Sequence, residues 1–364
     1  MHLIAGGDAG GAKTHLLNLL TRLCRDEEVT LVCLGDGVLA EEAKARGLTV
    51  KILSGNFAAC LRAVKDLAQG ADVLHCHGSR ANLTGALAKK VLSCPVISTL
   101  HSDHRLDYLG RPLARCTYGL LNSWALRRMD ALVCVSQAMK ERYAHRGFSR
   151  QRLYEIYNGV DFDAPLVSVD RQAWFARLGI PVTETDVIIG TAARFDPVKD
   201  LPTLLRGFAW AACREPRLKL VLAGSGAEEA RLKELAVSLN LTDRVFFPGW
   251  VADMEGFYAS VDLTALSSLS ETFPYAITDG ARYRKPTVAS AVGGIPELVE
   301  NGVNGFLFAP GDASTLAEEL VTVAEDGLRC RLGQALWEKA SVQFSLTAAV
   351  QRQREIYLTI SDGN

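Results

Sequence analysis

The sequence predicts an α/β protein made of two doubly wound parallel-sheet domains. Short apolar runs, typical of strands buried on both faces, alternate with amphipathic helical segments along the chain. The alternation pauses at turn and linker signals in residues 158–165 and then starts again. At 364 residues the chain is too long for one ordinary core and is about right for two.

Each element follows from this pattern in order. A strand at the N-terminus runs directly into a glycine turn. Further strands of the first half are expected at residues 29–34, 49–53, 73–76, 96–100 and 131–135, with helices at 13–24, 57–69 and 81–92. Strands of the second half are expected at 186–193, 218–223, 244–247, 261–266 and 287–290, and a final helix at 345–359. Ligands of such sheets bind at the carboxyl ends of the strands.

Composition excludes several classes of protein. Apolar residues make up 48% and charged residues 22%, which argues against a disordered or fibrous chain. No apolar run reaches the length of a membrane span, and the N-terminus lacks the features of a signal peptide. The nine cysteines form no C-x-x-C pair, so we expect buried thiols in a reducing cytoplasm. Residues 1–165 carry a net charge of +5 and the remainder −6, so the first half could favour an anionic surface or a phosphorylated acceptor.

The first candidate site is the glycine turn that ends the first strand. Gly7, Gly10 and Gly11 lie between a strand and the helix that carries His15. Glycines allow a ligand to approach closely, and a helix N-terminus attracts anions. A plain tight turn without a ligand explains the same residues. A dinucleotide site is disfavoured, because the G-x-G-x-x-G fingerprint is missing.

Polar residues also follow the strand at 96–100. His101, Ser102 and Asp103 come just after this buried run, where His101 could bind a sugar hydroxyl or a phosphate, although a loop histidine is the alternative. His75 and His77 share one face of a strand, but no third metal ligand is apparent in the sequence. We therefore expect no metal site there.

Two basic residues follow the first strand of the second half. Arg194 and Lys199 lie on one loop that leads to a helix. A forked guanidinium and a compact ammonium suit a diphosphate group, whose charge grows when it leaves a sugar. The alternative is a solvated surface pair.

The most informative stretch carries two carboxylates. Glu271 precedes a helix in whose first turn Pro274 is expected, and Asp279 lies eight residues later, a little over two helical turns along. The amides of Thr272 and Phe273 could hold sugar or phosphate oxygens, and Asp279 could reach a ribose diol. For Glu271 alone, a helix cap is the alternative.

Taken together, these residues resemble family 4 of the glycosyltransferases. The resemblance covers nearly the whole chain, and its most specific motifs are those at 224–226, 247–251, 270–274 and 293–297. It implies the GT-B fold, in which two Rossmann-like domains face a central cleft. It also implies transfer from a nucleotide diphosphate-sugar, with retention at the anomeric carbon, no required metal and no cofactor.

The resemblance also assigns roles by motif position. Arg194 and Lys199 would hold the diphosphate, Glu271 with residues 272–274 the donor sugar, Asp279 the ribose, and Trp250 and Val251 the base. Gly10, Gly11 and His101 would line the reaction centre, with Gly7, His15, Ser102 and Asp103 on the acceptor side. Residues 1–165, with a returning helix at 344–360, would form the acceptor-side domain, and residues 166–343 the donor domain. The family usually has Glu where this chain has Asp279, which puts donor affinity in question.

The donor base, sugar and acceptor remain open, with a UDP-sugar as the first expectation and GDP and ADP as alternatives. Residues 105–128 mix arginines with Tyr, Leu and Trp, which suits either an anionic membrane interface carrying a lipid-linked acceptor or an ordinary core-facing helix. Three rival functions are a nucleotide-sugar-binding protein without transferase activity, a sugar-nucleotide epimerase and an oxidoreductase. We expect a cytoplasmic enzyme, at the inner face of the membrane if the basic segment binds it, and no nucleic-acid partner.

Overall fold

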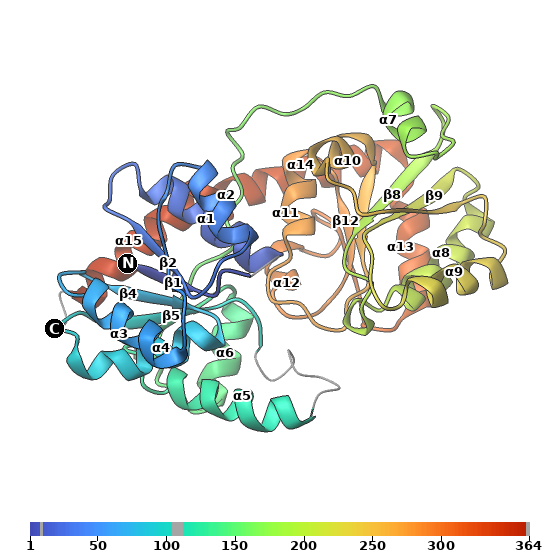
Figure 1. Cartoon of the computed structure of the whole chain (residues 1–364). Helices are drawn as coiled ribbons and strands as arrows, with labels where there is room; N and C mark the ends of the chain where they lie inside the picture. Colours follow the sequence, from blue (N-terminus) through green and yellow to red (C-terminus); the bar gives the residue numbers. More distant parts are fainter. Residues whose placement is uncertain (8–9, 104–111, 362–364) are drawn as a thin grey trace. The chain divides into compact units, whose positions relative to one another are not determined.

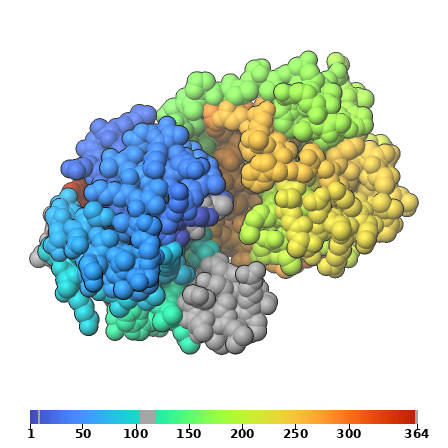
Figure 2. Space-filling model, viewed as in Figure 1, coloured from blue at the N-terminus to red at the C-terminus, as the bar shows by residue number. Residues whose placement is uncertain are grey.

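The computed structural model describes residues 1–7, 10–103 and 112–361, and of residues 112–118 only the backbone. The chain divides into two compact units. The first comprises Met1–Gly159 together with Leu346–Asn364, and the second comprises Val160–Ser345. Each unit is a parallel sheet flanked by helices (Figure 1). Figure 2 shows the outer surface of each unit, blue to teal for most of the first and light green to orange for most of the second.

The first unit contains a sheet in which every strand pair is parallel. Within the described residues its strands are β1 (His2–Ile4), β2 (Thr30–Cys33), β3 (Thr49–Ile52), β4 (Leu74–His77), β5 (Val96–Leu100), β6 (Ala131–Cys134) and β7 (Leu153–Glu155). Their order is β3-β2-β1-β4-β5-β6-β7. The helices are α1 (Gly11–Leu23), α2 (Val38–Ala45), α3 (Phe57–Leu67), α4 (Ser79–Ala88), α5 (Pro112–Leu126), α6 (Gln137–His145) and α15 (Leu346–Ser361), with short 3-10 helices η1 (Lys89–Val91) and η2 (Arg150–Arg152).

Helix α15 belongs to the first unit although it ends the chain. It lies beside α1, and its Leu346 and Val350 pack with the apolar face of α1 and the strands β1 and β2. Ala349 and Ile356 contribute to a second apolar cluster with residues of β5 and β6. The apolar positions recur at helical spacing, so one face of α15 is buried against the unit.

The second unit repeats the architecture with a smaller sheet of parallel strands. Within the described residues its strands are β8 (Val187–Ala192), β9 (Leu218–Ala223), β10 (Val245–Gly249), β11 (Leu263–Leu266), β12 (Thr287–Ser290) and β13 (Phe306–Phe308), in the order β10-β9-β8-β11-β12-β13. The helices are α7 (Arg171–Arg177), α8 (Leu201–Arg214), α9 (Glu229–Ser238), α10 (Met254–Ser260), α11 (Tyr275–Arg282), α12 (Ile295–Leu298), α13 (Ala313–Val323) and α14 (Asp326–Gln343), with the 3-10 helix η3 (Pro197–Lys199).

The predicted fold class is confirmed: the chain forms two doubly wound parallel sheets. Strands occupy the positions that the apolar runs predict, because those runs are the parts of the chain that can be buried on both faces. The sequence prediction missed two strands, β7 and β13, which have three residues each and lie at one edge of each sheet. Such short runs give almost no periodic signal.

Candidate functional site

Each sheet has one position where the strand order reverses. In the first unit this switch point lies between β1 and β4, and in the second between β8 and β11. Loops that leave neighbouring strands at such a point run to opposite faces of the sheet, which opens a crevice at the carboxyl ends of the strands. The residues singled out from the sequence follow these strands and their neighbours.

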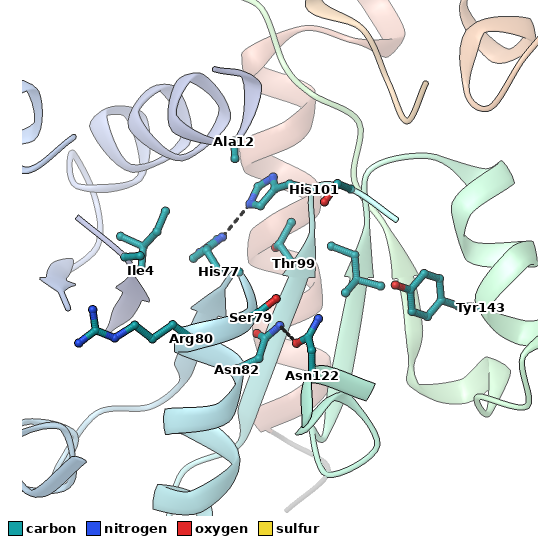
Figure 3. A pocket seen from close by; sticks show the side chains of 14 residues that line it. Ile4, Ala12, His77, Ser79, Arg80, Asn82, Thr99, His101, Asn122 and Tyr143 are labelled. Carbon is teal, nitrogen blue, oxygen red and sulfur yellow. Dashed lines mark hydrogen bonds between the residues drawn. The ribbon is translucent and has the colours of Figure 1, made fainter. Parts of the chain in front are cut away.

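The first unit has a pocket of about 320 Å³ at its switch point. The ends of β1, β4 and β5 and the beginning of α4 form its walls (Figure 3). The lining residues are Ile4, Ala5, Ala12, His77, Gly78, Ser79, Arg80, Asn82, Thr99, Leu100, His101, Ser102, Asn122 and Tyr143. The pocket is therefore lined by hydroxyl, amide and imidazole groups as well as apolar side chains.

The glycine turn borders this pocket through the neighbouring Ala5 and Ala12. Gly10 has a φ of 77°, in the left-handed region that favours glycine, and Gly11 begins α1. Gly7 has open space around it. The turn thus delivers the N-terminus of α1 to the edge of the pocket, the arrangement that binds anions or polar oxygens.

His101 lies in the pocket wall and is held from behind. Its Nε2 is 3.0 Å from Nδ1 of His77 (Figure 3). The ring of His15, on α1, lies edge-on to it with centroids 5.2 Å apart. Burial lowers the pKa of His15 to about 4, although the Asn158 side chain opposes the shift by hydrogen bonding. Both imidazoles are therefore neutral at physiological pH.

Ser102 and Asp103 have different surroundings. Ser102 is exposed and lines the pocket. Asp103 is buried, and its carboxylate accepts hydrogen bonds from Arg142 at 3.1 Å and from Arg146 at 2.7 and 2.8 Å, both on or next to α6. Asp103 thus ties the loop after β5 to α6.

Two amide residues of the pocket were missed by sequence reasoning. Asn82 donates to Asn122 at 3.0 Å (Figure 3), and its oxygen accepts from Ser98 at 2.6 Å. Asn82 sits in α4 and Asn122 in α5, both at buried positions. A buried polar residue within an apolar helical pattern was the available signal.

In the second unit, the loop after β8 carries the two basic residues. The Arg194 side chain is 76% exposed and pairs only at the surface with Asp196, at 3.0 Å. Lys199 ends η3, and its Nζ lies 2.5 Å from Oε1 of Glu271. The loop after β11, where Glu271 lies, is therefore joined directly to the loop after β8.

Glu271 is fixed from several directions. The same Oε1 atom also accepts from Ser268 Oγ at 2.7 Å, and its side chain is 10% exposed. Gly293 has a φ of 55°, and a Cβ built there would lie 1.7 Å from the Glu271 carbonyl oxygen. Only glycine can occupy position 293 without displacing this loop.

The residues after Glu271 lead into α11. The Thr272 carbonyl accepts from the Gly294 amide at 3.1 Å, and Phe273 is buried with its ring 5.1 Å from that of Phe344. Pro274 immediately precedes α11, as the sequence predicts for a helix start.

Asp279 lies on α11 and is partly buried. Burial raises its pKa to about 7, although the charge of Arg282 opposes the shift. Its field also adds to the burial that raises the pKa values of Tyr258 and Tyr275. The carboxyl group therefore changes its protonation state near neutral pH.

Trp250 and Val251 follow β10 and differ in exposure. Trp250 is 79% exposed, whereas Val251 is buried in a core cluster with Trp174 and Phe257. An exposed indole beside fixed backbone is a surface on which a planar base can stack.

The structure supplies a third histidine where the sequence shows only two. His2, on β1, lies beside His75 in the strand register, and one ring nitrogen of each of His2, His75 and His77 lies within 4.8 Å of the others. Residues 105–111 of the basic, aromatic segment lie outside the described residues, as do the side chains of 112–118. No helix among the described residues is long and apolar enough to cross a bilayer.

Comparison with known proteins identifies families for both halves of the chain. Residues 9–164 match Glycosyltransferase Family 4, and residues 170–338 match Glycosyl transferases group 1. A D-inositol 3-phosphate glycosyltransferase of Salinispora arenicola is 27% identical over 402 residues, which cover 98% of this chain and 89% of that protein. The N-acetyl-alpha-D-glucosaminyl L-malate synthase of Bacillus anthracis is 25% identical over 293 residues, covering 79% and 75% of the two chains.

Solved structures share the fold. The HepE protein of Anabaena in complex with UDP superposes with a TM-score of 0.86 at 24% identity, covering 98% of this chain and 99% of that one. Its complex with UDP-glucose gives 0.85, covering 99% and 100%. Sucrose-phosphate synthase of Thermosynechococcus elongatus gives 0.78 at 21% identity, covering 100% and 99%.

Proposed function

The chain belongs to the group 1 glycosyltransferases of family 4, and from this premise we propose that it transfers a hexose-type sugar from a UDP-sugar to an acceptor hydroxyl with retention at the anomeric carbon. The observation that carries the proposal is the contact of Lys199 with Glu271 beside the exposed Arg194, at the switch point of the second sheet. A cation for the diphosphate and a carboxylate for the sugar are thus adjacent before any ligand binds. The UDP and UDP-glucose complexes of HepE support the choice of nucleotide.

Each residue of the second unit has a role in this proposal. Arg194 and Lys199 bind the diphosphate, and Glu271 accepts hydrogen bonds from sugar hydroxyls. The amides of Thr272 and Phe273 contribute further donors, because they lie next to the start of α11. Asp279 accepts from the ribose, and the uracil stacks on Trp250 beside the backbone of Val251.

In the reaction, the bond between the anomeric carbon and the diphosphate oxygen breaks while the acceptor oxygen bonds to the same face of that carbon. The acceptor proton passes to the departing phosphate oxygen, so no protein nucleophile is required. Arg194 and Lys199 stabilise the charge that grows on the diphosphate, and in this proposal they take the place of a metal ion. His101 and the amides at Gly10 and Gly11 orient the reacting groups, with His15 and Ser102 toward the acceptor.

Calorimetric titration with UDP, GDP and ADP in the presence of EDTA tests the donor side. We expect UDP to bind and the other two to bind at least tenfold more weakly, since base contacts decide the difference. Binding of none of the three would remove the central support for the proposal. Product analysis then separates transfer, which releases UDP and a glycoside of unchanged anomeric configuration, from epimerisation, which yields an isomeric UDP-sugar.

For the acceptor, we propose a lipid-linked molecule at an anionic membrane surface. On α5, Leu120 and Leu121 are 69% and 48% exposed, and Arg128 stacks on Trp124 at 3.9 Å from its ring centroid. Exposed leucines next to basic and aromatic side chains suit the lipid interface. The protein should sediment with anionic vesicles at low salt, and the double variant Leu120→Ser, Leu121→Ser should not. If the unaltered protein ignores such vesicles, a polysaccharide acceptor replaces this proposal.

A further inference from the structure

A line of buried histidines leads away from the pocket into the first unit. Nε2 of His101 is 3.0 Å from Nδ1 of His77, and Nε2 of His77 is 3.0 Å from Nδ1 of His2. His2 and His77 are 3% and 1% exposed. The line begins at a pocket residue and ends on β1, beneath α15.

The line continues through Tyr357 of α15 and returns to the pocket. The Tyr357 hydroxyl is 3.1 Å from Nε2 of His2 and 2.7 Å from Nδ1 of His75. Nε2 of His75 is in turn 2.7 Å from the Thr99 hydroxyl, which lines the pocket. We call these six residues, from His101 to Thr99, the histidine chain.

The strand register explains why these side chains meet. His2 pairs with His75 in the parallel sheet, and His77 pairs with Thr99 on the next strand. Paired residues of parallel strands point to the same face, and residues two apart on one strand do so as well. The histidines therefore share the face of the sheet on which Tyr357 contacts them.

A metal ion does not fit this group as well as hydrogen bonds do. The ligand atoms of His2, His75 and His77 lie up to 4.8 Å apart. Two bonds of about 2.1 Å to one zinc ion reach at most about 4.2 Å. Moreover, both ring nitrogens of each of the three already lie at hydrogen-bond distance from another residue. The group is complete without an ion.

The histidine chain has a direction because its imidazoles are neutral. Burial lowers the pKa values of His2, His75, His77 and His101 well below the usual range. A neutral imidazole has one N–H donor and one accepting nitrogen. If one ring donates forward, every ring must do so, and the tautomers along the chain are coupled.

The contacts of Tyr357 select the direction. A hydroxyl donates over shorter distances than an N–H group, about 2.7–2.8 Å against about 2.9–3.0 Å. The 2.7 Å contact is therefore the phenol donating to Nδ1 of His75, and the 3.1 Å contact is Nε2–H of His2 donating to the phenol. It follows that Nδ1 of His2 accepts from Nε2–H of His77.

We propose that Tyr357, acting through His2 and His77, holds His101 in the tautomer that carries its hydrogen on Nε2. Nε2 of His101 donates to His77, and Nδ1 is the accepting nitrogen. His101 therefore recognises the O–H of a sugar hydroxyl and not a phosphate oxygen, which needs a donor. This selectivity rests on the proposed function, whereas the tautomer does not. Tyr357, on the returning helix, is a positioning residue for the pocket.

The tautomers can be read by NMR of protein labelled with ¹⁵N-histidine, because protonated and unprotonated ring nitrogens have distinct shifts. We expect Nε2–H at His101, His77 and His2 in the unaltered protein. In Tyr357→Phe, His2 loses its acceptor and His75 its donor, so His101 should become a mixture of tautomers. The matched control is Tyr154→Phe, since Tyr154 packs against the same core cluster outside the histidine chain.

Transfer is the second readout. Tyr357→Phe should lower kcat/KM about tenfold, the effect of one hydrogen bond misdirected at the site, while Tyr154→Phe leaves it unchanged. An Nδ1–H tautomer at His101 in the unaltered protein overturns the proposal, as does an unchanged tautomer in Tyr357→Phe. Stoichiometric zinc that shifts the signals of His2, His75 and His77 overturns it in favour of a metal site. The NMR result needs no substrate, so failure of the transferase assignment is recognised separately, by missing nucleotide binding.

Discussion

The ammonium of Lys199 and the carboxylate of Glu271 form an ion pair, with Nζ 2.5 Å from Oε1, although 72 residues separate them in the chain. The pair joins the loop after β8 to the loop after β11. In the absence of donor it holds the cation and the carboxylate in place. When a nucleotide-sugar binds, the diphosphate competes with Glu271 for Lys199, and Glu271 turns to the sugar.

Glu271→Ala should separate binding of the sugar from binding of the nucleotide. We expect affinity for UDP-sugar to fall by about 1.5–3 kcal/mol, because charge-assisted hydrogen bonds to the sugar are lost. Affinity for UDP alone should stay equal or rise, since Lys199 is released. Calorimetry measures both, with Glu229→Ala as control, because Glu229 forms a 2.7 Å ion pair with Lys233 on α9. Equal losses for UDP and UDP-sugar would contradict the assignment.

Arg194→Ala should weaken UDP without affecting the fold. The side chain is 76% exposed, so its removal leaves no buried group unpaired and Tm should not change. Affinity should fall by about 1.5–3 kcal/mol if the guanidinium pairs with the diphosphate. Arg231→Ala is the matched control, with 71% exposure and a similar surface ion pair. If both variants bind UDP alike, Arg194 is a surface residue only.

Asp279 should make UDP binding depend on pH. Burial raises its pKa to about 7, and only the ionised carboxylate accepts from both ribose hydroxyls. Affinity should therefore increase as the pH rises from about 6 to about 8. Asp279→Asn should remove this dependence, and Asp279→Glu should retain it. A flat profile in the unaltered protein would argue against ribose contact.

The same carboxyl group should affect stability. The folded protein holds a proton on Asp279 up to a pH of about 7, whereas the ordinary pKa is 3.8. The folded state thus binds more protons between these values, and its stability should fall as the pH rises through that window. Urea unfolding of Asp279→Asn should show a smaller decline with pH than the unaltered protein. An unchanged slope would mean that the carboxyl is not desolvated.

Gly293→Ala should disrupt the loop that carries Glu271. A Cβ at position 293 would lie 1.7 Å from the Glu271 carbonyl oxygen, in addition to the cost of a positive φ. At Gly302 the φ is also positive, 74°, but nothing lies within 4 Å of the added Cβ. Gly302→Ala should cost about 1 kcal/mol, the conformational cost alone, and Gly293→Ala considerably more with loss of UDP-sugar binding. Equal effects in urea unfolding would show that the contact is relieved by a small shift.

Asp103→Ala should act on stability more than on transfer. The carboxylate is buried and compensates Arg142 and Arg146, and removing it leaves two cations partly buried. We expect a loss of about 2–4 kcal/mol in the free energy of unfolding, at the lower end of buried pairs because both arginines remain partly exposed. Urea titration checks this. A normal stability with reduced transfer would place Asp103 at the acceptor instead.

The sequence by itself determined the two parallel sheets, because runs buried on both faces must be apolar along their whole length and cannot be hidden in composition. It also indicated Arg194, Lys199, Glu271 and Asp279, since polar residues that follow such runs lie at the edge where ligands bind. The strands β7 and β13 escaped prediction because three residues show no period.

Only the tertiary structure decided which residues meet. His2 and His75 are adjacent because β1 and β4 are neighbours in the sheet, and no local pattern specifies the register between strands that are distant in sequence. Tyr357 joins them because the final helix packs against the first unit. Local sequence specifies elements through burial and backbone geometry. Contacts between elements depend on how all of them pack at once, and the histidine chain and the ion pair of Lys199 with Glu271 arise at that level.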